Sequence, residues 1–76
     1  MPRFYFDVRR DGLVIADQEG EDLPDTAAAK REAGIAAVHL AKELLSGPRG
    51  VLIVEVRREG GQAVVRAKAS LEVDDV

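Results

Sequence analysis

The residues that could carry chemistry are few, and the first of them is the single histidine, His39. A general base or metal site centred on His39 would have to recruit nearby carboxylates such as Glu32 and Glu43. All three fall on the polar face of a predicted helix, where an imidazole gains neither burial nor a fixed orienting partner. We therefore interpret His39 as a solvated surface residue.

An acidic segment is the second candidate, with five carboxylates within nine residues: Asp17, Glu19, Glu21, Asp22 and Asp25. A calcium loop needs acidic ligands at alternating positions, glycine at the sixth and glutamate at the twelfth. Gly20 is fourth from Asp17, so the spacing does not fit, and we predict no metal and no cofactor. Binding of a small ligand or metal here stays open as a third hypothesis, which a thermal shift with calcium would reveal.

Nucleophilic catalysis also lacks its residues. The chain has no cysteine, which removes disulfides, thiolate metal sites and cysteine nucleophiles. Ser46, Ser70 and Thr26 have no histidine partner in a context such as a G-x-S-x-G elbow. The glycines are turn-forming singles and one pair, not a phosphate-cradling loop. We predict that the protein is not an enzyme and has no catalytic residue.

A basic sheet face is the candidate for recognising nucleic acid. Its predicted members are Arg3, Tyr5, Arg9, Arg57, Arg66 and Lys68. The one tyrosine could stack a base, as sheet platforms for single-stranded RNA do. However, a single aromatic residue makes a poor platform, acidic residues lie among these cations, and the net charge is −3. Nucleic-acid binding, or an antitoxin-like regulatory role, therefore stays the alternative function.

Length and composition set the frame for these residues. The 76 residues, 46% hydrophobic and 33% charged, predict one globular domain spanning 1–76. No stretch approaches the roughly 20 apolar residues of a membrane span, and the N-terminal residues read as a strand rather than a signal peptide. We therefore expect a cytoplasmic protein without a membrane partner.

Two hairpins are predicted by alternating apolar residues and by turn dipeptides. In the first, Asp11-Gly12 provides a type I′ turn that pairs Val8 with Ile15 and Phe6 with Asp17. In the second, Gly60-Gly61 provides a two-residue turn. That turn pairs Val56 with Val65, Val54 with Ala67, Leu52 with Ala69 and Glu55 with Arg66.

A helix is predicted between the hairpins, from about residue 26 to residue 46. Asp25 is the expected N-cap, and Gly47-Pro48 is a stop signal. The apolar sector of this helix is roughly 200° wide, twice what one sheet face requires. Its members are Ala29, Ala33, Ala36, Ala37, Val38, Leu40, Ala41, Leu44 and Leu45.

The fold class is therefore α+β, a single ββαββ domain with one helix packed across one face of a four-stranded antiparallel sheet. A helix between the second and third strands makes those two run parallel, so an all-antiparallel sheet places the first strand beside the third. The predicted strand order, numbered along the chain, is 2-1-3-4.

Apolar residues outside the predicted core indicate self-association. The candidates are Val14, Ile35, Val38, Leu45, Ile53 and Val64. Together with the wide helix stripe, they present more apolar surface than one copy can bury. Cyclic dimers are the commonest outcome of such surfaces. The leading interpretation is a non-catalytic interaction or structural module, a homodimer with a protein partner.

Three segments carry a resemblance to a known family. They are MPRFYFD at Met1 to Asp7, GEDLPDTAAA at Gly20 to Ala29, and VEVRREGGQAVV at Val54 to Val65. In these segments the chain resembles a family of small bacterial proteins that share a domain of unknown function. The resemblance implies no activity, substrate or catalytic residue.

Overall fold

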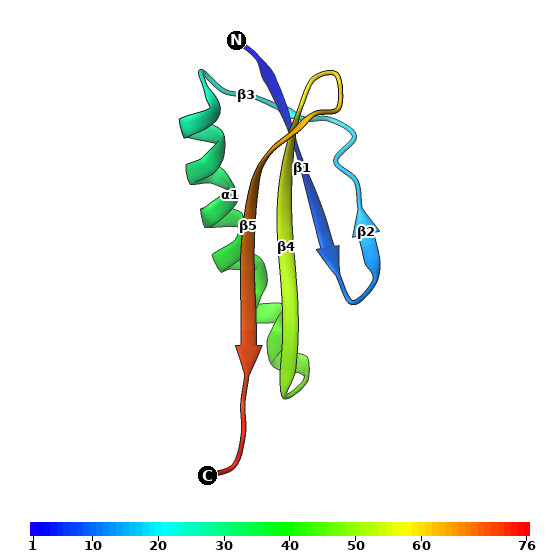
Figure 1. Cartoon of the computed structure of the whole chain (residues 1–76), viewed down its shortest axis with the longest axis vertical. Coiled ribbons are helices and arrows are strands. Elements are labelled where there is room, and N and C mark those ends of the chain that lie inside the picture. Colours follow the sequence, from blue (N-terminus) through cyan, green and yellow to red (C-terminus); the bar gives the residue numbers. More distant parts are fainter.

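The computed structural model describes residues 1–76 and begins with the first predicted hairpin (Figure 1). Strands β1 (Arg3–Arg10) and β2 (Leu13–Ile15) are joined by Asp11 and Gly12, whose φ angles are 50° and 77°. Positive φ at both central residues is what a type I′ turn requires. The pairing of Val8 with Ile15 is confirmed.

The predicted pairing of Phe6 with Asp17 as strand residues is wrong. β2 ends at Ile15, and the backbone N–H of Phe6 donates instead to the Asp17 carboxylate, with the nitrogen 3.1 Å from Oδ2. A short strand that the sequence did not predict, β3 (Glu21–Asp22), then pairs with Arg3 and Phe4 of β1. The outer edge of β1 is therefore covered in two pieces, with a carboxylate between them.

The predicted strand order is confirmed, in a sheet of five strands rather than four. The order is β2-β1-β4-β5, with β4 at Arg49–Arg58 and β5 at Ala63–Glu72, and β3 shares the outer edge of β1 with β2. All the pairings are antiparallel. The central strands are β1 and β4, and the long strand β5 forms one edge of the sheet (Figure 1).

The second hairpin has the predicted register but a different tip. The four predicted cross-strand pairs are present. Near the turn, however, Arg57 lies opposite Ala63, and the N–H of Arg58 donates to the carbonyl of Gln62 at 2.7 Å. The connection is therefore a three-residue loop followed by a bulge, a common hairpin geometry. The bulge places Val64 against the core, whereas the sequence predicted it to lie outside the core.

The helix begins at the predicted residue, but its last six residues form a 3₁₀ helix instead of an α-helix. In α1 (Thr26–Leu40), the Asp25 carboxylate caps the N-terminus by accepting from the N–H of Ala28 at 2.9 Å. The remaining six residues form a 3₁₀ helix, η1 (Ala41–Ser46). A 3₁₀ segment is frequent at a helix C-terminus. Here the Arg10 guanidinium donates to the carbonyl of Glu43 at 2.7 Å, which fixes that turn against β1.

The core lies between α1 and the strands β4 and β5, which are the strands that the helix contacts. Helix residues spaced by four face the sheet through small side chains, which lets the two layers approach closely. The cluster consists of Phe4, Ala29, Ala33, Ala37, Leu44, Leu52, Val54 and Val56. Val38 and Leu45, predicted in the apolar sector, are 72% and 70% exposed instead, because the helix spans only two strands and its contact stripe is narrower than predicted.

Candidate interaction surfaces

The sheet face away from the helix carries a hydrogen-bonded cluster of Asp7, Asp17 and Arg57. The Arg57 Nε lies 2.7 Å from Asp7 Oδ2, and Arg57 Nη2 donates to the carbonyl oxygen of Asp17 at 3.0 Å. The N–H of Asp17 donates to the other oxygen of Asp7 at 2.9 Å. Strands β1 and β4 and the loop after β2 are thus tied together by charge-assisted hydrogen bonds, which are the strong class.

Both carboxylates of this cluster are held ionised. Partial burial would raise the pKa of Asp7, but hydrogen bonds from Arg57 and the N–H of Asp17 outweigh it and lower that pKa below the ordinary value of an aspartate. Burial likewise opposes ionisation of Asp17, and the backbone N–H groups of Gly20, Phe6 and Glu19 overcome it, so its pKa is also lowered. The same contacts raise the pKa of Arg57, chiefly through its hydrogen bond to Asp7.

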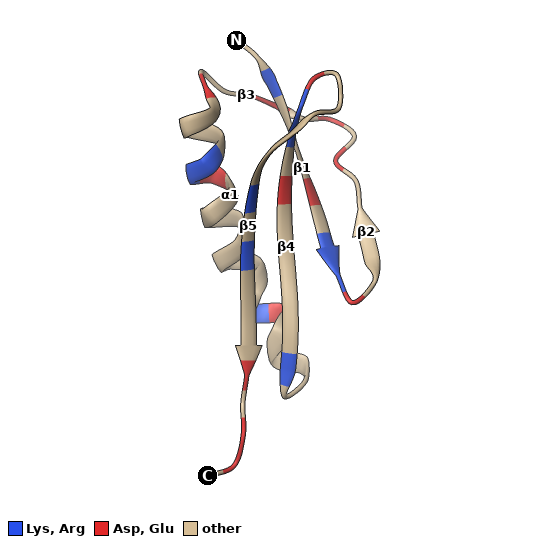
Figure 2. Cartoon of the chain, viewed as in Figure 1, with Lys and Arg blue, Asp and Glu red and all other residues tan.

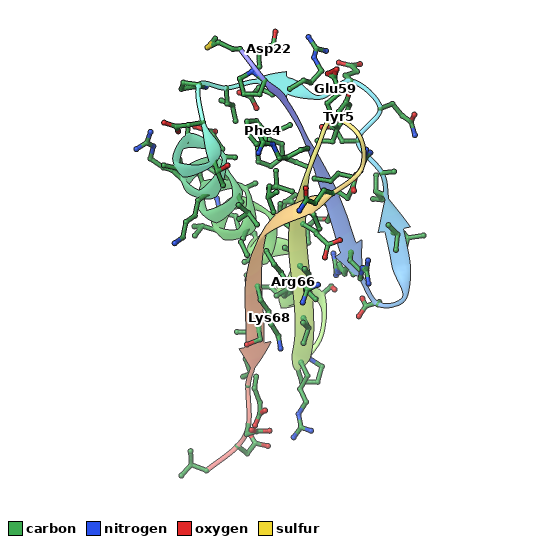
Figure 3. The ribbon with its side chains drawn as sticks, turned by 45° about the horizontal axis from the view of Figure 1, so that its top comes forward. Phe4, Tyr5, Asp22, Glu59, Arg66 and Lys68 are labelled. Carbon is green, nitrogen blue, oxygen red and sulfur yellow. The ribbon has the colours of Figure 1, made fainter.

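The loop after β2 lies on Tyr5, the residue proposed to stack a base. The Arg57 guanidinium sits 4.7 Å from the centre of the Tyr5 ring. Gly20, at a φ of 75°, packs so closely that a Cβ there would come within 2.9 Å of Tyr5 Cε2 and 2.8 Å of Arg3 Cγ. Figure 3 shows Tyr5 at the same end of the sheet as Asp22 and Glu59. Tyr5 is therefore partly buried, and the Arg57 guanidinium occupies one face of its ring.

The predicted basic face is divided by internal ion pairs. Three of its arginines have a carboxylate partner: Arg3 with Asp22 at 3.1 Å, Arg57 with Asp7 at 2.7 Å, and Arg66 with Glu55 at 2.8 Å. Arg9 and Lys68 form no such pair and lie on either side of Ile53 in one row across the sheet. Figure 2 shows the blue and red segments interleaved on these strands. The six residues share a face but do not form one cationic patch.

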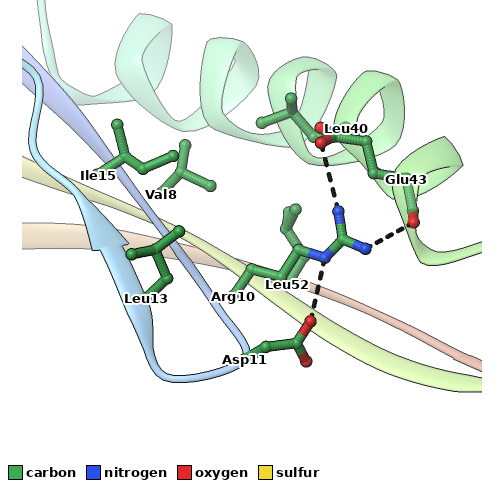
Figure 4. Close-up of a pocket in the computed structure, with 8 residues that line it drawn as sticks. All are labelled: Val8, Arg10, Asp11, Leu13, Ile15, Leu40, Glu43 and Leu52. Atoms are coloured by element: carbon green, nitrogen blue, oxygen red, sulfur yellow. Dashed lines mark hydrogen bonds and ion pairs between the residues drawn. The ribbon is translucent and has the colours of Figure 1, made fainter. Parts of the chain in front are cut away.

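An apolar groove lies on the other face, where the helix leaves β1 and β2 uncovered (Figure 4). It encloses about 420 Å³ and is lined by Val8, Leu13, Ile15, Leu40 and Leu52. Arg10 closes one end and bonds Glu43 and Asp11 at 3.3 and 3.4 Å. This groove was not predicted from the sequence, although Leu13, Val14 and Ile15 form an unbroken apolar run that could have indicated it.

The six residues predicted for self-association lie on different surfaces. Val14 and Ile53 stand on the open sheet face in one row, on either side of Arg9. Ile35 and Val38 form an exposed ridge on α1, and exposed Leu45 lies on η1. Val64 packs against the core from the bulge. The helix ridge and the open sheet face are thus two separate apolar surfaces.

The remaining candidates have structural surroundings. Asp25 caps the helix, Asp22 pairs with Arg3, and Glu19 and Glu21 are exposed. No three histidine or carboxylate side chains converge in a way that could hold a metal ion. His39 is exposed on α1 beside Val38, and Glu32 and Glu43 do not gather around it. No helix of this fold has the length and apolar character needed to cross a membrane.

Comparison with known proteins assigns the chain to one family. A search of the curated proteins found no match, and a search of the solved structures found none either. A family model matches residues 3–70, which run from the first residue of β1 to two residues before the end of β5. The chain belongs to the family described as Domain of unknown function (DUF6894).

Proposed function

We propose that this protein is a non-catalytic interaction module that works as a homodimer. The supporting observation is the imbalance between its core and its surface. Only nine residues are buried, whereas ten large hydrophobic side chains are exposed. Several of the exposed ones are neighbours: Leu13 and Ile15 on the groove, and Ile35 and Val38 on the helix ridge. Contiguous exposed apolar surface of this kind marks a protein interface.

The shape of the molecule favours such an interface. Its extents of 49 × 21 × 16 Å make it elongated, with 5334 Å² of accessible surface for 76 residues. A standard interface buries about 800 Å² on each partner. That area is about 15% of the 5334 Å² of this molecule, so one face is large enough to form such an interface. A second copy would cover exposed apolar groups that the small core leaves in water.

The charged groups support a non-catalytic role. Four side chains have displaced pKa values: Arg3, Asp7, Asp17 and Arg57. Asp7, Asp17 and Arg57 bind one another and the backbone, and Arg3 binds Asp22 and the carbonyl of Glu19. These bonds hold the loop after β2 on the sheet, so the displaced pKa values have a structural cause and do not indicate catalysis. We place this function in the cytoplasm. The chain has no cysteine and can form no disulfide, so its folding does not require an oxidising compartment.

Nucleic-acid binding remains the alternative proposal, carried by Arg9 and Lys68, which have no carboxylate partner. Salt separates it from the leading proposal, because phosphate contacts weaken steeply as ionic strength rises. Retention on heparin at low salt and its loss at moderate salt would favour this alternative. A chain that passes through heparin unretained at low salt would rule it out.

Sedimentation velocity across micromolar to submillimolar concentrations tests the homodimer. The monomer has a mass of 8.2 kDa, so a dimer has twice that, 16.4 kDa. We expect the larger species to dominate as the concentration rises, because burial of apolar surface drives association. A single 8.2 kDa species over the whole range would overturn the proposal.

A further inference from the structure

Strand β5 presents a ten-residue free edge, the longest unpaired backbone edge in the fold. The N–H of Val73 donates to the carbonyl of Pro48 at 2.8 Å, which continues the β4–β5 ladder. Because antiparallel strands alternate bonded and unbonded residues, odd-numbered residues from Val65 to Val73 bond β4. The N–H and C=O groups of the even-numbered residues therefore point outward, ready for another strand.

We propose that β5 pairs antiparallel with β5 of a second copy about a two-fold axis at Ala69, which joins the two sheets into one. This inference rests on the self-association proposed above and names its surface. The opposite edge offers only the three residues of β2 and the two of β3. Symmetric pairing of one strand with itself is an isologous contact, the kind that closes a dimer.

The charges on β5 select this register. Figure 2 shows two blue segments along β5 and a red one at its end, and Figure 3 shows Arg66 and Lys68 projecting from the strand. A two-fold axis at Ala67 would oppose Arg66 to Lys68 twice, and an axis at Lys68 would oppose two ammonium groups. Like charges directly opposite each other destabilise a strand pair.

An axis at Ala69 removes both conflicts. It sets Lys68 opposite Ser70 and Arg66 opposite Glu72, so that two opposite-charge pairs form across the interface. Residues 66–72 of each copy are paired in this register. A further shift to an axis at Ser70 keeps complementary charges but pairs only residues 68–72. Ala69 is thus the axis with the longest overlap that opposes no like charges.

The helix supports the same edge. Leu40 lines the groove on the β1–β2 side of α1. At 100° per residue, Gly34 and Val38 lie on the opposite flank from Ala36 and Leu40. The flank that carries Gly34 and Val38 is therefore on the same side of the molecule as the free edge of β5. In the proposed dimer, the helix of the partner would approach this flank. Gly34 has nothing within 4 Å of its Cβ position, and Val38 is among the most exposed apolar side chains of the helix, so both are free to take a neighbour.

A cysteine probe tests the axis directly, because the chain contains no cysteine of its own. Two Ala69→Cys residues would form a non-hydrogen-bonded pair with Cα atoms about 4.5 Å apart, within disulfide range. With oxidised glutathione as the oxidant, we expect a disulfide-linked dimer on a non-reducing gel. The matched control is Ala67→Cys, whose two copies would lie about 13 Å apart along the strands and should cross-link at least about tenfold less.

The outcomes distinguish this inference from the proposed function. A dimer in sedimentation that cross-links through Val14→Cys on the open face, and not through Ala69→Cys, would overturn β5 pairing but leave the homodimer. A monomer in sedimentation would overturn both. Glu72→Lys replaces the two attractive pairs by repulsive ones, and we expect it to raise the dimer dissociation constant about tenfold. Asp75→Lys makes the same charge change beyond the strand, and an equal effect from it would refute the register.

Discussion

Replacing Asp17 by alanine should destabilise the fold, because its carboxylate stands in for a missing strand residue. One oxygen accepts from the N–H of Phe6 at 3.1 Å. The other accepts from the N–H groups of Glu19 and Gly20 at 3.0 and 3.1 Å. Alanine would leave all three donors without a protein partner and release the loop from β1.

The size of the effect follows from which donors water can reach. The bond from Glu19 is exposed, whereas those from Phe6 and Gly20 are partly buried. Counting about 1–1.5 kcal/mol for each partly buried bond predicts a loss of about 2–3 kcal/mol. A domain of this length has about 4–11 kcal/mol in total. The melting temperature should therefore fall by about 10–20 °C.

Urea titration followed by circular dichroism measures this loss, at several protein concentrations so that dimerisation can be separated from folding. Gln18→Ala is the matched control, since this exposed neighbour makes no side-chain hydrogen bond, and it should change stability by less than about 0.5 kcal/mol. Asp17→Asn keeps one acceptor oxygen and should fall between the two. A loss below about 0.5 kcal/mol for Asp17→Ala would mean that water replaces the carboxylate, and the reasoning would fail.

Three further predictions concern the same fold. Leu52→Ala, in a side chain only 1% exposed, should cost about 2–5 kcal/mol in urea titration, and an effect no larger than that of exposed His39→Ala would contradict the described core. Gly20→Ala should cost more than about 1 kcal/mol, because its φ is positive and a Cβ would strike Tyr5, and an unchanged melting temperature would refute that packing. Asp7 and Asp17 have lowered pKa values, so their contribution is complete above about pH 4 and is lost as the pH falls through the lowered values. Asp7→Asn should therefore flatten the decline of stability in acid, and an identical slope would argue against this linkage.

The hairpin registers were predictable because each rests on a local signal, and the strand order followed from the direction in which the helix returns the chain. Asp11-Gly12 fixes one turn, and a one-residue slip in either hairpin would have turned its apolar residues to the wrong face. The helix start was equally local, since Asp25 is a strong N-cap residue. The alternation of Phe4, Phe6 and Val8 identified the core side of β1 before any tertiary contact was known.

The candidate surfaces were less predictable because they depend on contacts between distant segments. The sequence places Tyr5 and Arg57 on one face, but it does not show that Gly20 folds onto the Tyr5 ring or that Asp7 neutralises Arg57. The bulge at Val64 depends on how the Gly60-Gly61 tip closes, and the positive φ of both glycines allows more than one loop length. Val38 is exposed because the helix covers only two strands. The number of strands that a helix covers cannot be read from the periodicity of its apolar residues.

The two-piece covering of β1 limits how far an assembly of this protein could grow. Along its outer edge, β2, the Asp17 carboxylate and β3 take up the backbone groups that would otherwise template another chain. Short, interrupted strands are poor templates in their turn. Because β5 is its single long edge, each molecule can pair with only one other strand. Once two molecules have paired, neither has a long edge left for a third. Pairing through β5 would therefore stop at two copies and not propagate into a fibril, and loss of the Asp17 carboxylate would be the change that opens a second edge.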